Sequence, residues 1–117
     1  MRFEYPVFGT IVVDNSKFDH DIVLDDGELR PRDKGPSKSL KERYGHTPLS
    51  AGEDIPWAKP RLIIGSGYSG RLPIMDEIEE EAERRGVKVE VMKTEDAVRV
   101  LNESDQTSLN AILHVTC

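Results

Sequence analysis

Hydrophobic positions occur in short runs over the first thirty residues, and turn-forming residues separate these runs. The segments Val7 to Val13, Phe18 to Leu24 and Glu28 to Arg30 are typical of short strands. Asp14-Asn15-Ser16 and Asp25-Asp26-Gly27 lie between them and favour tight turns. The pattern predicts an antiparallel β-meander at the N-terminus.

The second half of the chain alternates between strand-like and helix-like patterns. A continuous apolar run, Leu62 to Ile64, is typical of a central strand covered on both faces. The segment Pro73 to Arg85 has a narrow apolar stripe at helical spacing, with Gly86 as its stop signal. Apolar and charged residues alternate over Val87 to Val91, which predicts a strand near the edge of a sheet.

A last helix and a last strand complete the pattern. Thr94 is placed to cap a helix whose inward side carries Ala97, Val98 and Leu101. The apolar segment Ala111 to Thr116 predicts a closing strand, and an ending this apolar is expected to be tied into the core.

These elements predict one α/β domain over residues 1–117. The N-terminal antiparallel β-meander is followed by a βαβαβ C-terminal part, and no linker or repeat divides the chain. A chain of 117 residues is long enough to bury one core of its own.

The composition narrows the choice of function. A net charge of -6 and a pI near 5.1 argue against a general nucleic-acid binder, because phosphate binding requires a basic face. No apolar stretch approaches the roughly 18 residues of a membrane span. Met1 to Val13 also lacks the pattern of a leader peptide. We therefore expect a soluble, cytoplasmic protein that binds neither nucleic acid nor membrane.

Cysteine and histidine residues show no metal-binding pattern. Cys117 is the only cysteine, which excludes an intrachain disulfide and a cysteine-rich zinc site. His20, His46 and His114 are scattered, and no pair has the spacing of metal ligands. We expect no metal and no cofactor, and the reactivity of Cys117 stays open.

Residues 30–43 form a basic island in an acidic protein. A solvated loop with a short helix at Ser39 to Tyr44, ended by Gly45, is the favoured interpretation. The alternative is a contact with an anion or an acidic partner. The island contains Arg30, Arg32, Lys34, Lys38, Lys41 and Arg43, against only Asp33 and Glu42.

The segment Arg61 to Leu72 contains the strongest candidate site. A predicted strand runs directly into the pattern Gly65-x-Gly67-x-x-Gly70, and a predicted helix follows. The free backbone N–H groups and the positive end of the helix dipole favour an anion at such a turn. The candidate ligand-binding residues are Gly65, Ser66, Gly67, Ser69, Gly70 and Arg71.

This glycine pattern has three interpretations. Tight packing between strand and helix is favoured, a small anion such as phosphate or sulfate is second, and a dinucleotide is third. A dinucleotide would use Glu90, twenty positions after Gly70, as the acceptor for a ribose hydroxyl. Leu72-Pro73 directly after the turn and the missing half of a doubly wound sheet argue against it.

An enzymatic function has little support from the sequence. Gly67 to Arg71 lacks the spacing of a nucleophile elbow, although Asp76 and His114 follow in the order of a hydrolase. Few titratable groups are placed to converge in a pocket. The sequence favours a role without catalysis and leaves enzymatic activity undecided.

Three segments carry a resemblance to a known family. They are Ile63-Ile64-Gly65-Ser66-Gly67, Phe18-Asp19-His20-Asp21-Ile22-Val23 and the terminal His114-Val115-Thr116-Cys117, whose family-motif positions are His114, Thr116 and Cys117. The chain resembles a small domain-of-unknown-function family that includes an adipogenesis-associated protein and a mitochondrial respiratory complex I assembly factor.

The resemblance implies a compact three-layer α/β domain with a mixed central sheet, cytoplasmic in microbes. It implies no established enzymatic activity, and the family's known roles point toward protein assembly. Gly45-His46-Thr47-Pro48 departs from a Gly-Thr-Ser-His-like segment that many members carry.

We therefore expect a binding or assembly module with a protein partner. The alternative is an anion- or nucleotide-binding protein that uses the glycine turn.

Overall fold

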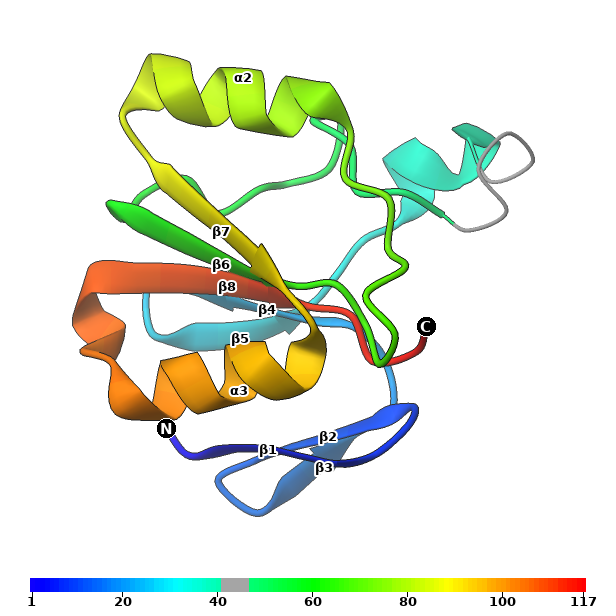
Figure 1. Cartoon of the computed structure of the whole chain (residues 1–117), viewed down its shortest axis with the longest axis vertical. Helices are drawn as coiled ribbons and strands as arrows, with labels where there is room; N and C mark the ends of the chain where they lie inside the picture. Colours follow the sequence, from blue (N-terminus) through cyan, green and yellow to red (C-terminus); the bar gives the residue numbers. More distant parts are fainter. Residues whose placement is uncertain (41–46) are drawn as a thin grey trace.

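Eight strands form two separate sheets in the computed structural model, which describes residues 1–40 and 47–117 (Figure 1). The smaller sheet has the order β1-β2-β3, and the larger sheet has the order β5-β4-β8-β6-β7. The strands are β1 (Phe3–Val7), β2 (Thr10–Val13), β3 (Ser16–Phe18), β4 (Ile22–Asp25), β5 (Glu28–Pro31), β6 (Arg61–Gly65), β7 (Lys88–Met92) and β8 (Leu109–Leu113). The helices described are the 3₁₀ helices η1 (Gly35–Leu40) and η2 (Gln106–Ser108) and the α-helices α2 (Asp76–Arg85) and α3 (Thr94–Glu103).

The first 31 residues contain five strands, β1 to β5, where three were predicted. The predicted strand Val7 to Val13 is wrong at its start, because Gly9 has a φ of 85° and turns the chain between β1 and β2. The tight turn at Asp14 and Asn15 is confirmed by their left-handed φ values of 48° and 69°.

The predicted strand Phe18 to Leu24 is also wrong, because its two halves belong to different sheets. β3 ends at Phe18, and β4 begins at Ile22 and pairs with β5 and β8. Between them Asp21 is buried, and its carboxylate accepts the N–H of Val115. A buried carboxylate with partners in other segments stops the strand where the chain changes sheets.

The closing strand lies at the centre of the larger sheet. β8 pairs antiparallel with β4 and parallel with β6, and it ends at Leu113, earlier than the predicted Thr116. The connection β6-α2-β7-α3-β8 matches the predicted βαβαβ part, and β7 lies at the edge of the sheet as predicted. The sheet is therefore mixed.

The helix α2 begins at Asp76 and not at Pro73. The segment before it is extended, because Leu49 donates its N–H to the Pro73 carbonyl and forms a parallel bridge with Ile74. Gly86 ends the helix with a left-handed φ of 70°, as predicted.

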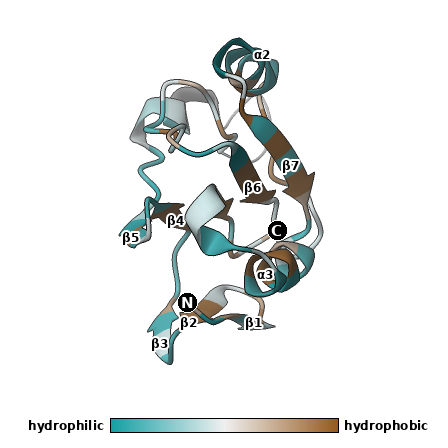
Figure 2. Cartoon of the chain, turned by 90° about the vertical axis from the view of Figure 1, so that its left-hand side faces the viewer, coloured by the Kyte–Doolittle hydropathy of each residue, from teal (hydrophilic) through white to brown (hydrophobic). Residues whose placement is uncertain are grey.

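Two hydrophobic clusters lie on opposite faces of the larger sheet. On one face, Leu101 of α3 packs with Phe3 and Ile11 of the smaller sheet. On the other face, Ile78 of α2 packs with Leu49. Figure 2 shows that α2 is mostly hydrophilic, whereas β6 and β7 contain hydrophobic stretches. The buried residues of α2 are Ile78 and Ala82. The predicted compact mixed α/β fold is confirmed. Within the described ranges, no helix has the length and apolar character needed to cross a membrane.

Candidate functional site

The adjacent parallel strands β6 and β7 lead to helices on opposite faces of the sheet. β6 leads to α2, whose Ile78 belongs to one core cluster, and β7 leads to α3, whose Leu101 belongs to the other. In α/β sheets, ligands bind at such a point, outside the carboxyl ends of the strands. The glycine turn (residues 65–71) and residues 114–117 meet there (Figure 1).

Gly67 is required by the close approach of the chain's last residues. It has a φ of 106°, and a Cβ at this position would lie 2.2 Å from the Cys117 carbonyl carbon and 2.6 Å from the Thr116 carbonyl oxygen. Both the left-handed backbone and the contact distance exclude a side chain. Gly67 thus packs against residues 116 and 117, and not between strand and helix as the sequence favoured.

The backbone N–H groups of the glycine turn bind within the chain. Gly67 donates to the Thr94 hydroxyl at 2.9 Å, Tyr68 donates to the Thr116 carbonyl at 2.8 Å, and Arg71 donates to a main-chain oxygen of Cys117 at 2.9 Å. Three N–H groups that an anion could have used are therefore occupied by oxygens of Thr94, Thr116 and Cys117.

Thr94, the first residue of α3, binds the same turn through its hydroxyl. The prediction that Thr94 caps α3 is wrong, because Lys93 is the N-cap residue and makes no side-chain capping bond. The buried Thr94 hydroxyl instead donates to the His114 carbonyl and accepts the Gly67 N–H. Its side chain joins β6, α3 and the end of β8.

Glu90 is not placed as a dinucleotide site requires. It lies within β7 opposite Ile63, and its carboxylate accepts two hydrogen bonds from the Arg61 guanidinium at 2.8 and 3.1 Å. The hydrogen bond from Arg61 holds the pKa of Glu90 below its usual value. The ribose acceptor expected from the spacing is thus bound to Arg61.

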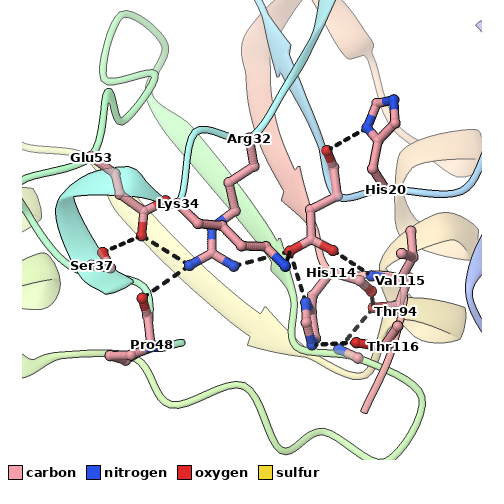
Figure 3. A network of polar contacts seen from close by, with 12 residues as sticks. His20, Arg32, Lys34, Ser37, Pro48, Glu53, Thr94, His114, Val115 and Thr116 are labelled. Atoms are coloured by element: carbon pink, nitrogen blue, oxygen red, sulfur yellow. Dashed lines mark hydrogen bonds and ion pairs between the residues drawn. The ribbon is translucent and has the colours of Figure 1, made fainter. Parts of the chain in front are cut away.

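A buried network of charged groups lies beside the turn, at the same end of the sheet (Figure 3). Arg32 donates to both Glu53 oxygens at 2.7 and 2.9 Å, to Asp21 at 2.9 Å and to the Pro48 carbonyl at 2.9 Å. Burial acts to lower the pKa of Arg32, but the hydrogen bonds and charges of Glu53 and Asp21 outweigh it and raise that pKa above its usual value.

Asp21 connects this arginine to the end of β8. Its Oδ2 lies 2.8 Å from His114 Nδ1, and its Oδ1 accepts the Val115 N–H at 3.0 Å. Burial acts to raise the pKa of Asp21, but the hydrogen bond and charge of His114, the Val115 N–H and the Lys34 ammonium outweigh it. The pKa lies well below its usual value, so the carboxylate is ionised at neutral pH.

We call Asp21, Arg32, Glu53 and His114 the polar clamp. Each is at most 8% exposed, and no buried side-chain nitrogen or oxygen lacks a hydrogen-bond partner in the described ranges. The clamp connects four places in the chain. Asp21 directly precedes β4, Arg32 directly follows β5, Glu53 lies in the loop before β6, and His114 directly follows β8.

The clamp contains the chemical groups of a proton relay, in an unsuitable setting. Asp21, His114 and the Thr116 hydroxyl, 3.2 Å from His114 Nε2, follow one another as in an acyl-transfer triad. However, Asp21 also binds Arg32 and Lys34, and His114 is only 5% exposed. The arrangement can fix chain segments far better than it can present a base to a substrate.

The basic island is only partly a solvated loop. Arg32 is buried in the clamp, Arg30 pairs with Asp25 and Asp54, and Lys34 lies 3.6 Å from Asp21. The solvated interpretation is therefore wrong for Arg32. The helix predicted at Ser39 to Tyr44 and its stop at Gly45 fall mainly on residues 41–46, outside the described part of the chain, as does His46.

Ser37 and Ser50 surround the clamp residue Glu53. Glu53 accepts from the Ser37 hydroxyl at 2.6 Å and from the Ser50 N–H at 3.4 Å, while the two serine hydroxyls are 2.5 Å apart. Sequence reasoning singled out His114 and missed its partners. An acidic residue directly before an apolar strand, as Asp21 is before Ile22, is a weak local signal that identifies none of its partners.

Exposed aromatic side chains lie next to this buried network. Phe8 and Tyr68 are 53% and 58% exposed, and their ring centroids lie 6.1 Å apart in an edge-to-face arrangement. We call Val7, Phe8 and Tyr68 the aromatic surface. It combines the β1–β2 turn with the glycine turn, although about sixty residues separate them in the sequence.

The predicted site residues thus divide into two groups. The buried residues Gly65, Ser66 and Gly67 hold β6 against β7 and residues 114–117. The exposed residues are Ser69, Gly70 and Arg71. Of the three family-motif residues, His114 is in the polar clamp, whereas Thr116 and Cys117 are half-buried beside the turn.

A hollow of about 350 Å³ lies at the opposite end of the sheet. It is formed by the β4–β5 turn and the residues around η2, and its lining is Met1, Leu24, Asp26, Gly27, Lys59, Gln106 and Thr107. No group of histidine, cysteine, aspartate and glutamate residues suited to a metal occurs in the described residues.

Fold and site together define a small α/β domain in which a polar clamp holds the carboxyl end of a mixed sheet. The chain belongs to the family described as protein of unknown function (DUF498/DUF598), whose model matches residues 4–114. None of the curated proteins matches it.

Solved structures agree with this assignment. A conserved hypothetical protein from Pyrococcus horikoshii OT3 is 29% identical over 100% of both chains, with a TM-score of 0.83. The protein MT938 is 26% identical over 98% of this chain and 97% of its own, with a TM-score of 0.71. An Mth938-like domain from Bordetella pertussis is 19% identical over 93% of this chain and 82% of its own, with a TM-score of 0.52, and shows the fold alone.

Proposed function

We propose that this protein is a non-enzymatic binding module that docks a partner protein, in an assembly role, through the aromatic surface. The observation that carries the proposal is the pair of exposed rings, Phe8 and Tyr68, held together from two distant turns. Exposed single apolar side chains are common, whereas two aromatic rings and Val7 gathered at one place are typical of an interaction site.

Both turns of the aromatic surface are anchored on the same strip of main chain. Gly9 donates to the Val115 carbonyl at 2.8 Å, and Tyr68 donates to the Thr116 carbonyl at 2.8 Å. The backbones beneath the rings are therefore fixed before any partner arrives, which lowers the entropy lost on binding. Burying one aromatic side chain contributes roughly 1.5 to 3 kcal/mol.

The state of the titratable groups supports a role without catalysis. An enzyme needs such groups to converge on a space that a substrate can enter. Here the carboxylates, Arg32 and His114 face one another in the interior. The resemblance of the sequence to a family with roles in protein assembly is a second support. A cytoplasmic location, with which the single cysteine Cys117 is compatible, is part of the proposal.

The alternative proposal is an anion- or nucleotide-binding protein. The backbone N–H groups of Gly67, Tyr68 and Arg71 are bound to oxygens of Thr94, Thr116 and Cys117. An anion would therefore depend on the exposed Ser69 and on the side chain of Arg71. We rank it below protein binding for this reason.

A peptide selection tests the docking proposal. A phage-displayed library of random peptides is selected on the immobilised protein, and enriched peptides are measured by fluorescence polarisation. We expect the double variant Phe8→Ser, Tyr68→Ser to bind them at least about thirtyfold more weakly, because an aromatic anchor contributes about 2 kcal/mol or more at an interface.

The matched control is Val91→Ser. Val91 is 43% exposed on the edge strand β7, outside the aromatic surface, and its replacement should change affinity less than twofold. Thermal unfolding of each variant confirms that it is folded. Enrichment of no peptide, or equal binding to the double variant, would refute the docking proposal.

A further inference from the structure

Arg71 is an exposed cation at the end of the glycine turn, with a fixed backbone. The backbone N–H of Arg71 donates to a main-chain oxygen of Cys117 at 2.9 Å, and Arg71 as a whole is exposed. No carboxylate of the described residues lies within 4.0 Å of its guanidinium. Most arginines of the described ranges differ in this respect, because a carboxylate pairs with each of Arg30, Arg32, Arg61, Arg84, Arg85 and Arg99.

A second cation borders the same turn. Lys93 is exposed and directly precedes α3, and its side-chain stem lies next to Gly70, since a Cβ there would meet Lys93 Cγ at 3.4 Å. Gly70 is the residue before Arg71 and the second after Tyr68. Arg71 and the ring of Tyr68 therefore belong to the glycine turn, and the second cation, Lys93, lies beside it.

Three acidic residues of α2 and α3 have other neighbours. Glu95 follows Lys93 in α3 but lies at the surface hollow between α3 and β1, together with Arg2 and Glu4. Asp96 is paired with Arg99 in the same helix. Glu77, in the first turn of α2, accepts the N–H of Ala51.

We propose that the partner docks through an acidic segment, whose carboxylates bind Arg71 and Lys93 while an adjacent apolar side chain packs on Phe8 and Tyr68. This inference rests on the proposed function and names the chemistry of the partner. The guanidinium of Arg71 suits bidentate binding of a carboxylate, and cations that flank aromatic rings are typical of binding hot spots.

Charge also distinguishes a short acidic segment from larger polyanions. The chain has a net charge of -6, which repels nucleic acid and anionic membrane at long range. At physiological ionic strength this repulsion is screened beyond about 8 Å, so direct contacts decide the binding of a short segment. A local pair of cations thus selects an acidic peptide.

Charge-removing variants and matched peptides test the inference. A peptide enriched in the selection is compared with a version in which Gln or Asn replaces its acidic residues. We expect Arg71→Gln and Lys93→Gln each to weaken the acidic peptide three- to tenfold at 50 mM salt and less at 500 mM. The amide version should bind the wild type more weakly and respond to neither variant.

Arg2→Gln is the matched control. It removes the same charge from an exposed arginine that also has no carboxylate of the described residues within 4.0 Å, at the far end of β1 from Phe8 (Figure 1). Its effect on affinity should be less than twofold.

The outcomes separate the inference from the function on which it rests. Peptides that need Phe8 and Tyr68 but contain no excess of acidic residues, or that bind Arg71→Gln normally, overturn the acidic partner and leave the docking module intact. If the wild-type protein enriches no peptide, both the acidic partner and the docking module are overturned. Co-sedimentation with phosphatidylserine vesicles gives the affinity for an anionic membrane. If this affinity exceeds that for the acidic peptide and is lost in Arg71→Gln, the partner is a membrane surface and not an acidic segment.

Discussion

The polar clamp and the aromatic surface lie at the same end of the larger sheet, and they invert the usual distribution of side chains. Asp21 is 3% exposed although it is charged, whereas Tyr68 is 58% exposed although it is aromatic. The two regions share one element. Asp21 holds the Val115 N–H, and the carbonyls of Val115 and Thr116 hold the turns that carry Phe8 and Tyr68.

The difference shows how this fold separates stability from recognition. Charges that are fully paired inside the domain fix residues 114–117, and those residues in turn position side chains that contribute little to the core. We therefore expect substitutions in the clamp to act on unfolding, and substitutions in the aromatic surface to act on binding.

The largest effect should follow from Arg32→Ala. The substitution leaves Asp21 and Glu53 buried without their cation, and breaking a buried ion pair on one side costs about 3 to 5 kcal/mol. Urea unfolding followed by circular dichroism measures the loss. Arg84→Ala, which breaks an exposed pair with Glu81, is the control and should cost less than about 1 kcal/mol. Equal losses in the two variants would contradict the clamp.

Gly67→Ala should produce the next largest effect. The left-handed φ alone costs about 1 kcal/mol, and a Cβ at 2.2 Å from the Cys117 carbonyl carbon adds a displacement of the main chain that costs about 1 to 3 kcal/mol more. Gly27→Ala is matched to it, because Gly27 also has a positive φ of 80° but has open space around a Cβ. A loss no greater than that of Gly27→Ala would show that residues 115–117 are not held against the turn.

Acid should weaken the clamp through Asp21. Because its pKa in the folded protein is below the ordinary value of 3.8, the stabilisation is complete above that value and is lost as the pH falls below it. The difference in unfolding free energy between the wild type and Asp21→Asn, followed from pH 7 to pH 2.5, should therefore shrink below about pH 4. A difference that stays constant over this range would be inconsistent with an ionised, stabilising carboxylate.

Periodic patterns predicted the architecture better than they predicted the site. Leu62 to Ile64, the stop at Gly86 and the edge strand near Val89 were readable because each follows a local rule of spacing or backbone conformation. The split of the predicted strand at Asp21 was not readable. It depends on Arg32 and His114, and no local pattern brings these three residues together.

For the glycine turn, the sequence predicted the position of the turn but not its hydrogen-bond partners. The sequence placed Gly65, Gly67 and Gly70 correctly between a strand and a helical segment. The contact that requires Gly67 is with residues 116 and 117, and not the expected one between strand and helix. The acceptors of the Tyr68 and Arg71 N–H groups, however, are main-chain oxygens of Thr116 and Cys117, far along the chain. Backbone acceptors have no residue signature, so spacing rules cannot distinguish them from a bound anion.

The smallest effect on stability should come from the aromatic surface, and this prediction separates docking residues from core residues. Phe8→Ala and Tyr68→Ala should each lower the unfolding free energy by about 1 kcal/mol or less, because more than half of each side chain is already exposed. An edge-to-face pair contributes about 0.5 to 1.5 kcal/mol, so a double-mutant cycle in urea should show coupling at the low end of that range. Losses above about 2 kcal/mol would mean that the rings belong to the core. Small losses together with a large loss of peptide binding would instead confirm that these side chains are exposed for a partner.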